Sequence, residues 1–163
     1  MKTKKLTVMA LTTALAMILS FVESQIPAFV AVPGVKMGLA NIAVVFALYK
    51  LGWKEAVAIS LVRVVLVSML FGSIASLFYS LAGAVLSLAG MGLLKKSGRF
   101  TEIVVSVAGG ILHNIGQIAM ASIILETDAL RYYLPFLLLS GIVAGVVIGV
   151  VSAIMVRRIR ITI

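Results

Sequence analysis

Long apolar segments alternate with short polar ones along the whole chain. The hydrocarbon core of a bilayer is ~30 Å thick, so a helix needs about 20 mostly apolar residues to cross it. Six such spans use about 120 of the 163 residues and leave only short loops. The pattern predicts an all-α integral membrane protein that forms a single domain over residues 1–163. The six expected spans are residues 6–22, 38–49, 55–71, 74–94, 103–125 and 132–156.

Helix-breaking residues separate these spans. Pro27, Pro33 and Gly34 block helix continuation in the loop 23–37. Gly72 and Ser73 predict an almost loopless turn between the third and fourth spans. The second and third spans are short, so they are either tilted or, for the second, partly buried within the bundle.

Basic residues predict how the six spans are oriented in the membrane, because cytoplasmic loops are enriched in Lys and Arg. Only Lys36 and Arg131 fall on one face, and Arg63 lies inside a span. We therefore expect both termini inside the cell. The residues on the opposite, inner face are Lys2, Lys4, Lys5, Lys50, Lys54, Lys95, Lys96, Arg99, Arg157, Arg158 and Arg160.

The composition excludes an ordinary soluble domain. Hydrophobic residues make up 63% of the chain and charged residues 12%, whereas soluble domains have about 45–50% and about 25%. The net charge of +9 suggests nucleic acid in a soluble protein, but here the charges sit at span ends, where the positive-inside rule explains them. We expect no nucleic-acid partner.

The basic, apolar N-terminus also resembles a secretory signal, but residues 6–22 exceed the usual apolar region of about 7–15 residues. We interpret it as the first span, with cleavage as the alternative.

Small residues recur at helical spacing where helices approach closely. Gly141, Gly145 and Gly149 stand one turn apart in the last span, and a similar row of Ser and Gly follows residues 76–90. For these two spans we favour packing within the chain over subunit contact. For Ala10 and Ala14 in the first span, both interpretations stay open.

Large polar side chains inside spans are costly and usually functional. They converge at mid-membrane depth and toward the outer side, together with Tyr79 of the fourth span, which predicts a substrate pocket open to the outside. The alternative is that they only hydrogen-bond one another between helices. The candidate substrate-binding residues are Asn41, Arg63, Tyr79, His113, Asn114 and Gln117.

Arg63 is the most informative of these residues. It lies about nine residues from either end of its span, too far for its side chain to reach water easily. No acid lies in a predicted span at its depth, so we expect its partners to be helix carbonyls, water, amide side chains or an anionic ligand. A structural clamp and a contact to a ligand anion both remain open.

Catalytic and metal-binding motifs are absent from the sequence. There is one His and no Cys, so the ligand set for a metal site is missing. There is no Walker A loop for ATP hydrolysis and no paired aspartates to hold magnesium and diphosphate. We expect a noncatalytic membrane subunit without a cofactor.

Several segments together resemble a known family. They are Ala10-x-x-x-Ala14, KMGLAN at 36–41, Arg63 followed by FGS at 71–73, HNIGQ at 113–117, and Leu134-Pro135 with the glycine row after it. The chain resembles the Gx transporter family, also labelled heptaprenyl diphosphate synthase component I. That family is similar to the substrate-binding S components of energy-coupling factor (ECF) transporters.

The resemblance implies an S-component-like bundle in a prokaryotic plasma membrane, with a ligand cavity facing outward and capped by the first loop. It implies three partners, a transmembrane coupling protein and two cytoplasmic ATPases, and a contact of Ala10 and Ala14 with the coupling protein. The substrate would be a small molecule of hydrophobic, isoprenoid or vitamin-like character, moved as the whole subunit tips over in the bilayer. The second interpretation is a noncatalytic accessory subunit in prenyl diphosphate, quinone or redox-chain machinery.

Overall fold

The computed structural model describes residues 2–25, 38–127 and 129–160, and all regular secondary structure in this part of the chain is helical. The predicted all-α class is confirmed for these residues. The loop residues Pro27, Pro33, Gly34 and Lys36 lie outside the described part. The elements in chain order are α1 (Lys2–Gln25), α2 (Asn41–Lys50), α3 (Trp53–Phe71), α4 (Ile74–Ser97), α5 (Glu102–Ile124), the short 3₁₀ helix η1 (Ala129–Tyr133) and α6 (Leu134–Arg158).

Four of these helices, α1, α4, α5 and α6, are long and apolar enough to cross a membrane. The chain is therefore a membrane protein. Helix α3 has 19 residues, which is long enough, but Lys54, Glu55 and Arg63 make it more polar than the other four. Helix α2 has 10 residues and spans only ~15 Å, half of the hydrocarbon core. Six complete spans remain a prediction.

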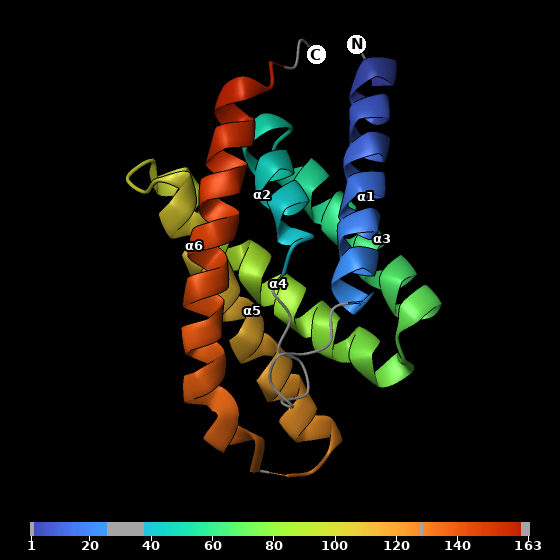
Figure 1. The fold of residues 1–163 in the computed structure, drawn as a ribbon, viewed down its shortest axis with the longest axis vertical. Coiled ribbons are helices and arrows are strands. Elements are labelled where there is room, and N and C mark those ends of the chain that lie inside the picture. Colours follow the sequence, from blue (N-terminus) through green and yellow to red (C-terminus); the bar gives the residue numbers. More distant parts are fainter. Residues whose placement is uncertain (1, 26–37, 128, 161–163) are drawn as a thin grey trace.

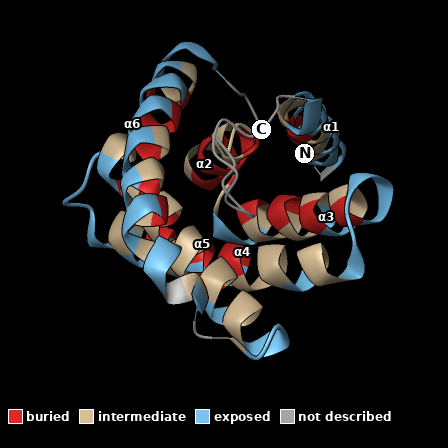
Figure 2. Ribbon diagram, turned by 60° about the horizontal axis from the view of Figure 1, so that its bottom comes forward, coloured by how far each residue is buried: buried red, intermediate tan, exposed pale blue. Residues whose placement is uncertain are grey.

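Helix α2 is the central element, surrounded by the other helices (Figure 2). Every residue from Ala43 to Leu48 is buried. An α-helix that is apolar on all sides has no polar face to turn toward solvent, so it belongs in the interior. Its side chains pack against Ile59 of α3, Leu88 of α4 and Val105 of α5 in one hydrophobic cluster. The interpretation of the second segment as buried within the bundle is confirmed.

Local signals set the helix ends. The second span was expected to start at residue 38, but it becomes helical only at Asn41. Gly38 has a positive φ of 74°, which ends the helical pattern there. It opens a turn in which the Gly38 carbonyl accepts a hydrogen bond from the Asn41 N–H. At the predicted turn between α3 and α4, the Ser73 and Ser76 side chains each accept a hydrogen bond from the other's backbone N–H. This capping box starts α4 immediately after Gly72.

Glycines let α5 and α6 touch backbone to backbone. A Cβ added at Gly110 would lie 2.6 Å from the carbonyl oxygen of Gly141, and one at Gly145 would lie 2.6 Å from the Cα of Val107. On the other side of α5, a Cβ at Gly116 would lie 2.8 Å from Gly83 of α4. The predicted intramolecular role of the small-residue rows in α4 and α6 is confirmed.

The beginning of α1 and the ends of α2 and α6 lie at one end of the bundle (Figure 1). Two contacts hold that end together: an ion pair of 2.5 Å between Lys5 and Glu55, and a hydrogen bond from Lys95 to the Leu48 carbonyl. The Lys95 ammonium also lies 5.1 Å from the centre of the Tyr49 ring, a cation–π contact. Basic residues from α1 and α4 thus gather at one end, as predicted. Which side of the membrane this end faces remains a prediction.

Candidate functional site

A cavity of about 110 Å³ lies between the helices and takes lining residues from all six of them. This volume has room for several water molecules or a small polar group. The cavity extends from the level of Met91 and Ser106 to the turn between α3 and α4, where Phe71 and Gly72 line it. Within each helix the lining residues recur at intervals of three or four, so each helix contributes one face.

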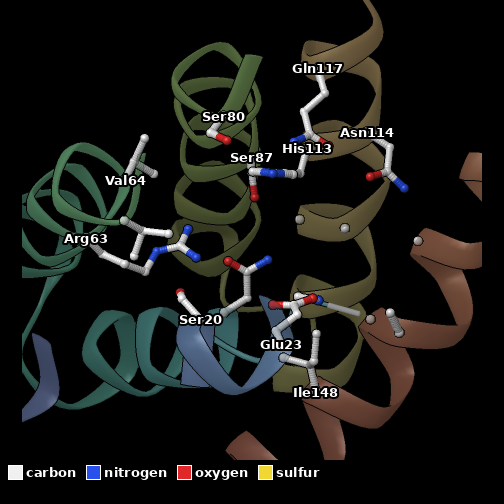
Figure 3. A pocket seen from close by; sticks show the side chains of 18 of the residues that line it. Ser20, Glu23, Arg63, Val64, Ser80, Ser87, His113, Asn114, Gln117 and Ile148 are labelled. Atoms are coloured by element: carbon white, nitrogen blue, oxygen red, sulfur yellow. The ribbon is translucent and has the colours of Figure 1, made fainter. Parts of the chain in front are cut away.

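Five of the six predicted site residues line this cavity. Arg63 comes from α3, and His113, Asn114 and Gln117 come from consecutive turns of α5. Asn41 joins them from the first turn of α2. Figure 3 shows Arg63 facing His113 and Gln117 across the cavity, although the three lie on two helices far apart in sequence.

Tyr79 is the predicted residue that does not line the cavity; its neighbour Ser80 does. One residue along an α-helix turns the side-chain direction by about 100°. Ser76, Ser80 and Ser87 are four and seven residues apart and share the face of α4 that lines the cavity, so Tyr79 falls beside that face. Membrane depth, the criterion that selected Tyr79, does not distinguish the faces of a helix.

Glu23 corrects the electrostatic picture drawn from the sequence. It was placed in an outer loop, but α1 continues to Gln25 and Glu23 lines the cavity together with Ser20 and Ser24 on the same face. Its carboxylate attracts the Arg63 guanidinium electrostatically. It also accepts a hydrogen bond of 2.5 Å from the N–H of Gly38. A carboxylate of α1 therefore acts on the charge of Arg63, which the position of Glu23 in the predicted loop had not indicated.

The Arg63 side chain still carries an unused donor. Its Nε atom is fully buried and has no hydrogen-bond partner among the described residues. A guanidinium presents five N–H donors and cannot lose its charge in proteins. An orphaned donor on a buried cation is costly, and a bound solute or water that accepts from it removes this cost.

Serine hydroxyls supply most of the remaining polar surface, and sequence reasoning missed several of them. The serines of α4 belong to the row at 76–90, which the sequence predicts to serve helix packing. For some of the missed serines, helical register with a recognised polar residue is a signal that could have found them, such as Ser106, which lies seven positions or two turns before His113. The lining serines are Ser20, Ser24, Ser68, Ser76, Ser80, Ser87 and Ser106.

The amide of Asn114 is partly committed to holding helices together. Its Nδ2 atom donates to the carbonyl of Leu137 on α6 at 2.5 Å. His113 and Gln117 instead run across Gly83 of α4, where an added Cβ would approach both side chains within about 3 Å. Asn114 thus bonds between helices, as the alternative interpretation expected for the polar groups, whereas Gln117 lies over a glycine at the cavity wall.

Ala10 and Ala14 are exposed on α1, away from the cavity. Helix α1 packs chiefly against α3 and α2, and its buried residues, among them Thr12 and Ala16, lie on the opposite face. The two alanines therefore belong to a face of α1 that the described residues of the chain leave exposed.

The cavity combines one guanidinium, one carboxylate, one imidazole, three amides and several hydroxyls. Such a set can bind and orient a polar solute through hydrogen bonds and charge. Among residues 2–25, 38–127 and 129–160, no three His, Cys, Asp or Glu side chains gather closely enough to hold a metal ion.

Residues 12–155 match the family model described as heptaprenyl diphosphate synthase component I. The match covers most of the chain and includes all the lining residues of the cavity. No curated protein and no solved structure matches the chain.

Proposed function

The chain belongs to the heptaprenyl diphosphate synthase component I family, and we propose that it is the noncatalytic substrate-binding subunit of an ECF-type, ATP-driven transporter in a prokaryotic plasma membrane. One observation carries the proposal: a polar cavity, lined by all six helices, inside a bundle that is otherwise apolar. Buried polar groups are costly in a membrane, and a binding site for a small molecule is a reason to keep them.

In this proposal the cavity holds the substrate and the partner proteins supply the energy. ATP hydrolysis in two cytoplasmic ATPases acts through a transmembrane coupling protein, and the whole subunit tips over to release the solute inside. The exposed face of α1 with Ala10 and Ala14 supports this arrangement, because small side chains let another helix approach closely in a membrane.

A second candidate, a noncatalytic accessory subunit in prenyl diphosphate, quinone or redox-chain machinery, is favoured by the description of the family itself. The cavity argues against a purely hydrophobic ligand such as an isoprenoid chain alone, whereas the diphosphate head of a prenyl diphosphate suits its charged groups. Seven serines and charged groups line it, and an isoprenoid chain offers none of the hydrogen bonds that such groups require. We therefore expect a polar, vitamin-like substrate rather than a purely hydrophobic one.

Native mass spectrometry of the protein, purified gently from its own host, tests the proposal. We expect a bound small molecule together with a coupling protein and two ATPase subunits. A chain that carries no small molecule, or one bound to a prenyl diphosphate synthase or electron-transfer protein, would support the accessory role and contradict the transporter.

A variant with two substitutions tests the partner surface. Ala10→Leu with Ala14→Leu adds bulk to the α1 face and should reduce co-purifying ATPase at least about tenfold, since close helix approach requires small residues. The bound small molecule should remain, because neither alanine lines the cavity. The matched control is Leu11→Phe with Leu15→Phe, which adds bulk to a neighbouring exposed face of the same helix. Equal loss of ATPase in both variants would contradict a specific surface.

A further inference from the structure

Arg63 occupies the middle of α3, a 19-residue helix, and its side chain projects into the cavity from one wall (Figure 3). A cation in this position is expensive unless a negative charge or several acceptors surround it. Its Nε atom is buried without a hydrogen-bond partner among the described residues. The most strongly charged donor in the cavity is thus incompletely satisfied.

Glu23 compensates the charge of Arg63 only in part. Its carboxylate attracts the guanidinium, yet it also accepts from the Gly38 N–H at the start of the turn before α2. The Nε–H group of Arg63 donates no hydrogen bond to this carboxylate. The arrangement leaves a position beside Arg63 that an additional acceptor would fill.

The other lining groups favour a solute that accepts hydrogen bonds. Hydroxyls from α1, α3, α4 and α5 can donate, as can the amides of Asn41 and Gln117. Charge-assisted hydrogen bonds from a guanidinium to a carboxylate or phosphate are among the strongest that a site can offer. The volume of about 110 Å³ accommodates a compact anionic group.

We propose that the cavity binds its solute through an anionic group of the carboxylate or phosphate class, seated on the guanidinium of Arg63 and surrounded by the hydroxyls of α4 and the amides of α2 and α5. This names the substrate class of the transporter and so rests on the proposed function. The same chemistry can come from a soluble anion or from the headgroup of an anionic lipid, and the experiment separates the two.

The chain contains no cysteine, so a single introduced cysteine reports on its own surroundings. Ser80→Cys places a thiol in the cavity wall with almost no change in volume. In detergent, its labelling rate is measured with the anionic sulfonatoethyl, the cationic trimethylammonioethyl and the neutral methyl methanethiosulfonate. Each labelling rate at Ser80→Cys is divided by the rate of the same reagent at a control cysteine, Ile74→Cys. We expect this normalised rate to be about tenfold higher for the anionic reagent than for the cationic one.

Ile74→Cys is the matched control, because Ile74 is 77% exposed on the first turn of the same helix and does not line the cavity. It corrects for the intrinsic reactivity of each reagent. Arg63→Gln should abolish the preference for the anionic reagent in the Ser80→Cys background. Arg63→Lys should retain it, and guards against the possibility that the loss reflects misfolding.

Occupancy is tested by protection of the same cysteine. In phosphatidylcholine nanodiscs, 50 mM acetate or inorganic phosphate should slow labelling relative to sodium chloride of equal ionic strength if a soluble anion binds. If the occupant is a lipid headgroup, phosphatidylglycerol nanodiscs should slow it without added anion. Protection by neither overturns the proposal, as does equal reactivity with both charged reagents or no reaction with any of the three.

These outcomes are independent of the transporter role. A neutral small molecule found with the coupling and ATPase subunits would leave the transporter standing and overturn the anionic class. Protection of Ser80→Cys by an anion, in a chain that co-purifies with no such partners, would support the anionic class and contradict the transporter.

Discussion

Asn114 and Gln117 lie one helical turn apart on α5, and both line the cavity, but their amides have different surroundings. Asn114 donates to the Leu137 carbonyl of α6. Gln117 lies across Gly83 of α4, where its Cγ comes within 2.9 Å of an added Cβ. The first amide links two helices, while the second is positioned at the cavity wall.

We therefore expect two different results from truncating these amides. Asn114→Ala should lower the free energy of unfolding by about 0.6–1.7 kcal/mol, the range of interhelical hydrogen bonds in membranes, and should also weaken binding. Gln117→Ala should weaken binding with little loss of stability. Unfolding in mixed detergent micelles and the fraction of chain carrying the native small molecule measure the two effects. Unchanged binding in both variants would refute their assignment to the site.

Arg63, His113 and Gln117 could be predicted from the sequence because large polar residues stand out in an apolar span. Glu23 could not be placed correctly, because its position depends on α1 continuing to Gln25, three residues past the end of the apolar run. Tyr79 was included for its depth, although its side chain lies on a different face of α4 from Ser80. Membrane depth follows from position along a span, whereas the inward face of a helix depends on its neighbours.

At the scale of elements, α4, α5 and α6 form a layer whose spacing is set by glycine. A Cβ added at Gly145 would lie 2.6 Å from the Cα of Val107, and one added at Gly110 would lie against the backbone of Gly141. Backbone atoms cannot rotate away as a side chain does, so a methyl group at this contact forces the helices apart. Because α5 and α6 both line the cavity, their separation also changes its shape.

Gly145→Ala should destabilise the protein by about 1–3 kcal/mol, the usual cost of overpacking a close contact. The control is Val147→Ala on the same helix, since Val147 is 57% exposed and faces away from α5. We expect its effect to stay within about 0.5 kcal/mol. The free energy of unfolding in mixed micelles distinguishes them, and equal values for the two variants would contradict a tight contact at Gly145.

Element boundaries followed from the sequence wherever the chain carries a strong local signal. Gly72 and Ser73 marked the turn before α4, and the capping box with Ser76 explains why the helix begins at once. The length of α2 did not follow, because the apolar pattern continues back to Gly38 while the backbone there adopts a positive φ. Its central place in the bundle was one of two alternatives, and tertiary packing rather than periodicity decides it.

At the scale of the whole molecule, basic residues gather at one end of the long axis, and the cavity runs from near that end toward the other. Lys5 and Lys95 lie with their partners at one end, with the beginning of α1 and the ends of α2 and α6 (Figure 1). The cavity extends from Met91 and Ser106 toward the turn between α3 and α4, where Gly72 lines it. If the basic end is cytoplasmic, as the positive-inside rule predicts, the cavity extends toward the outer side and can capture a solute from outside.

Cysteine labelling in cells decides this orientation. Ser97→Cys places an exposed thiol at the end of α4 near the basic residues, and Glu126→Cys places one just beyond α5, at the opposite end. A membrane-impermeant maleimide should label Glu126→Cys in intact cells at least about tenfold faster than Ser97→Cys, because Lys and Arg retain their end of the bundle inside. Permeabilised cells provide the control, in which both should react. The reverse preference in intact cells would turn the cavity toward the cytoplasm, and uptake from outside would then require a different starting state of the subunit.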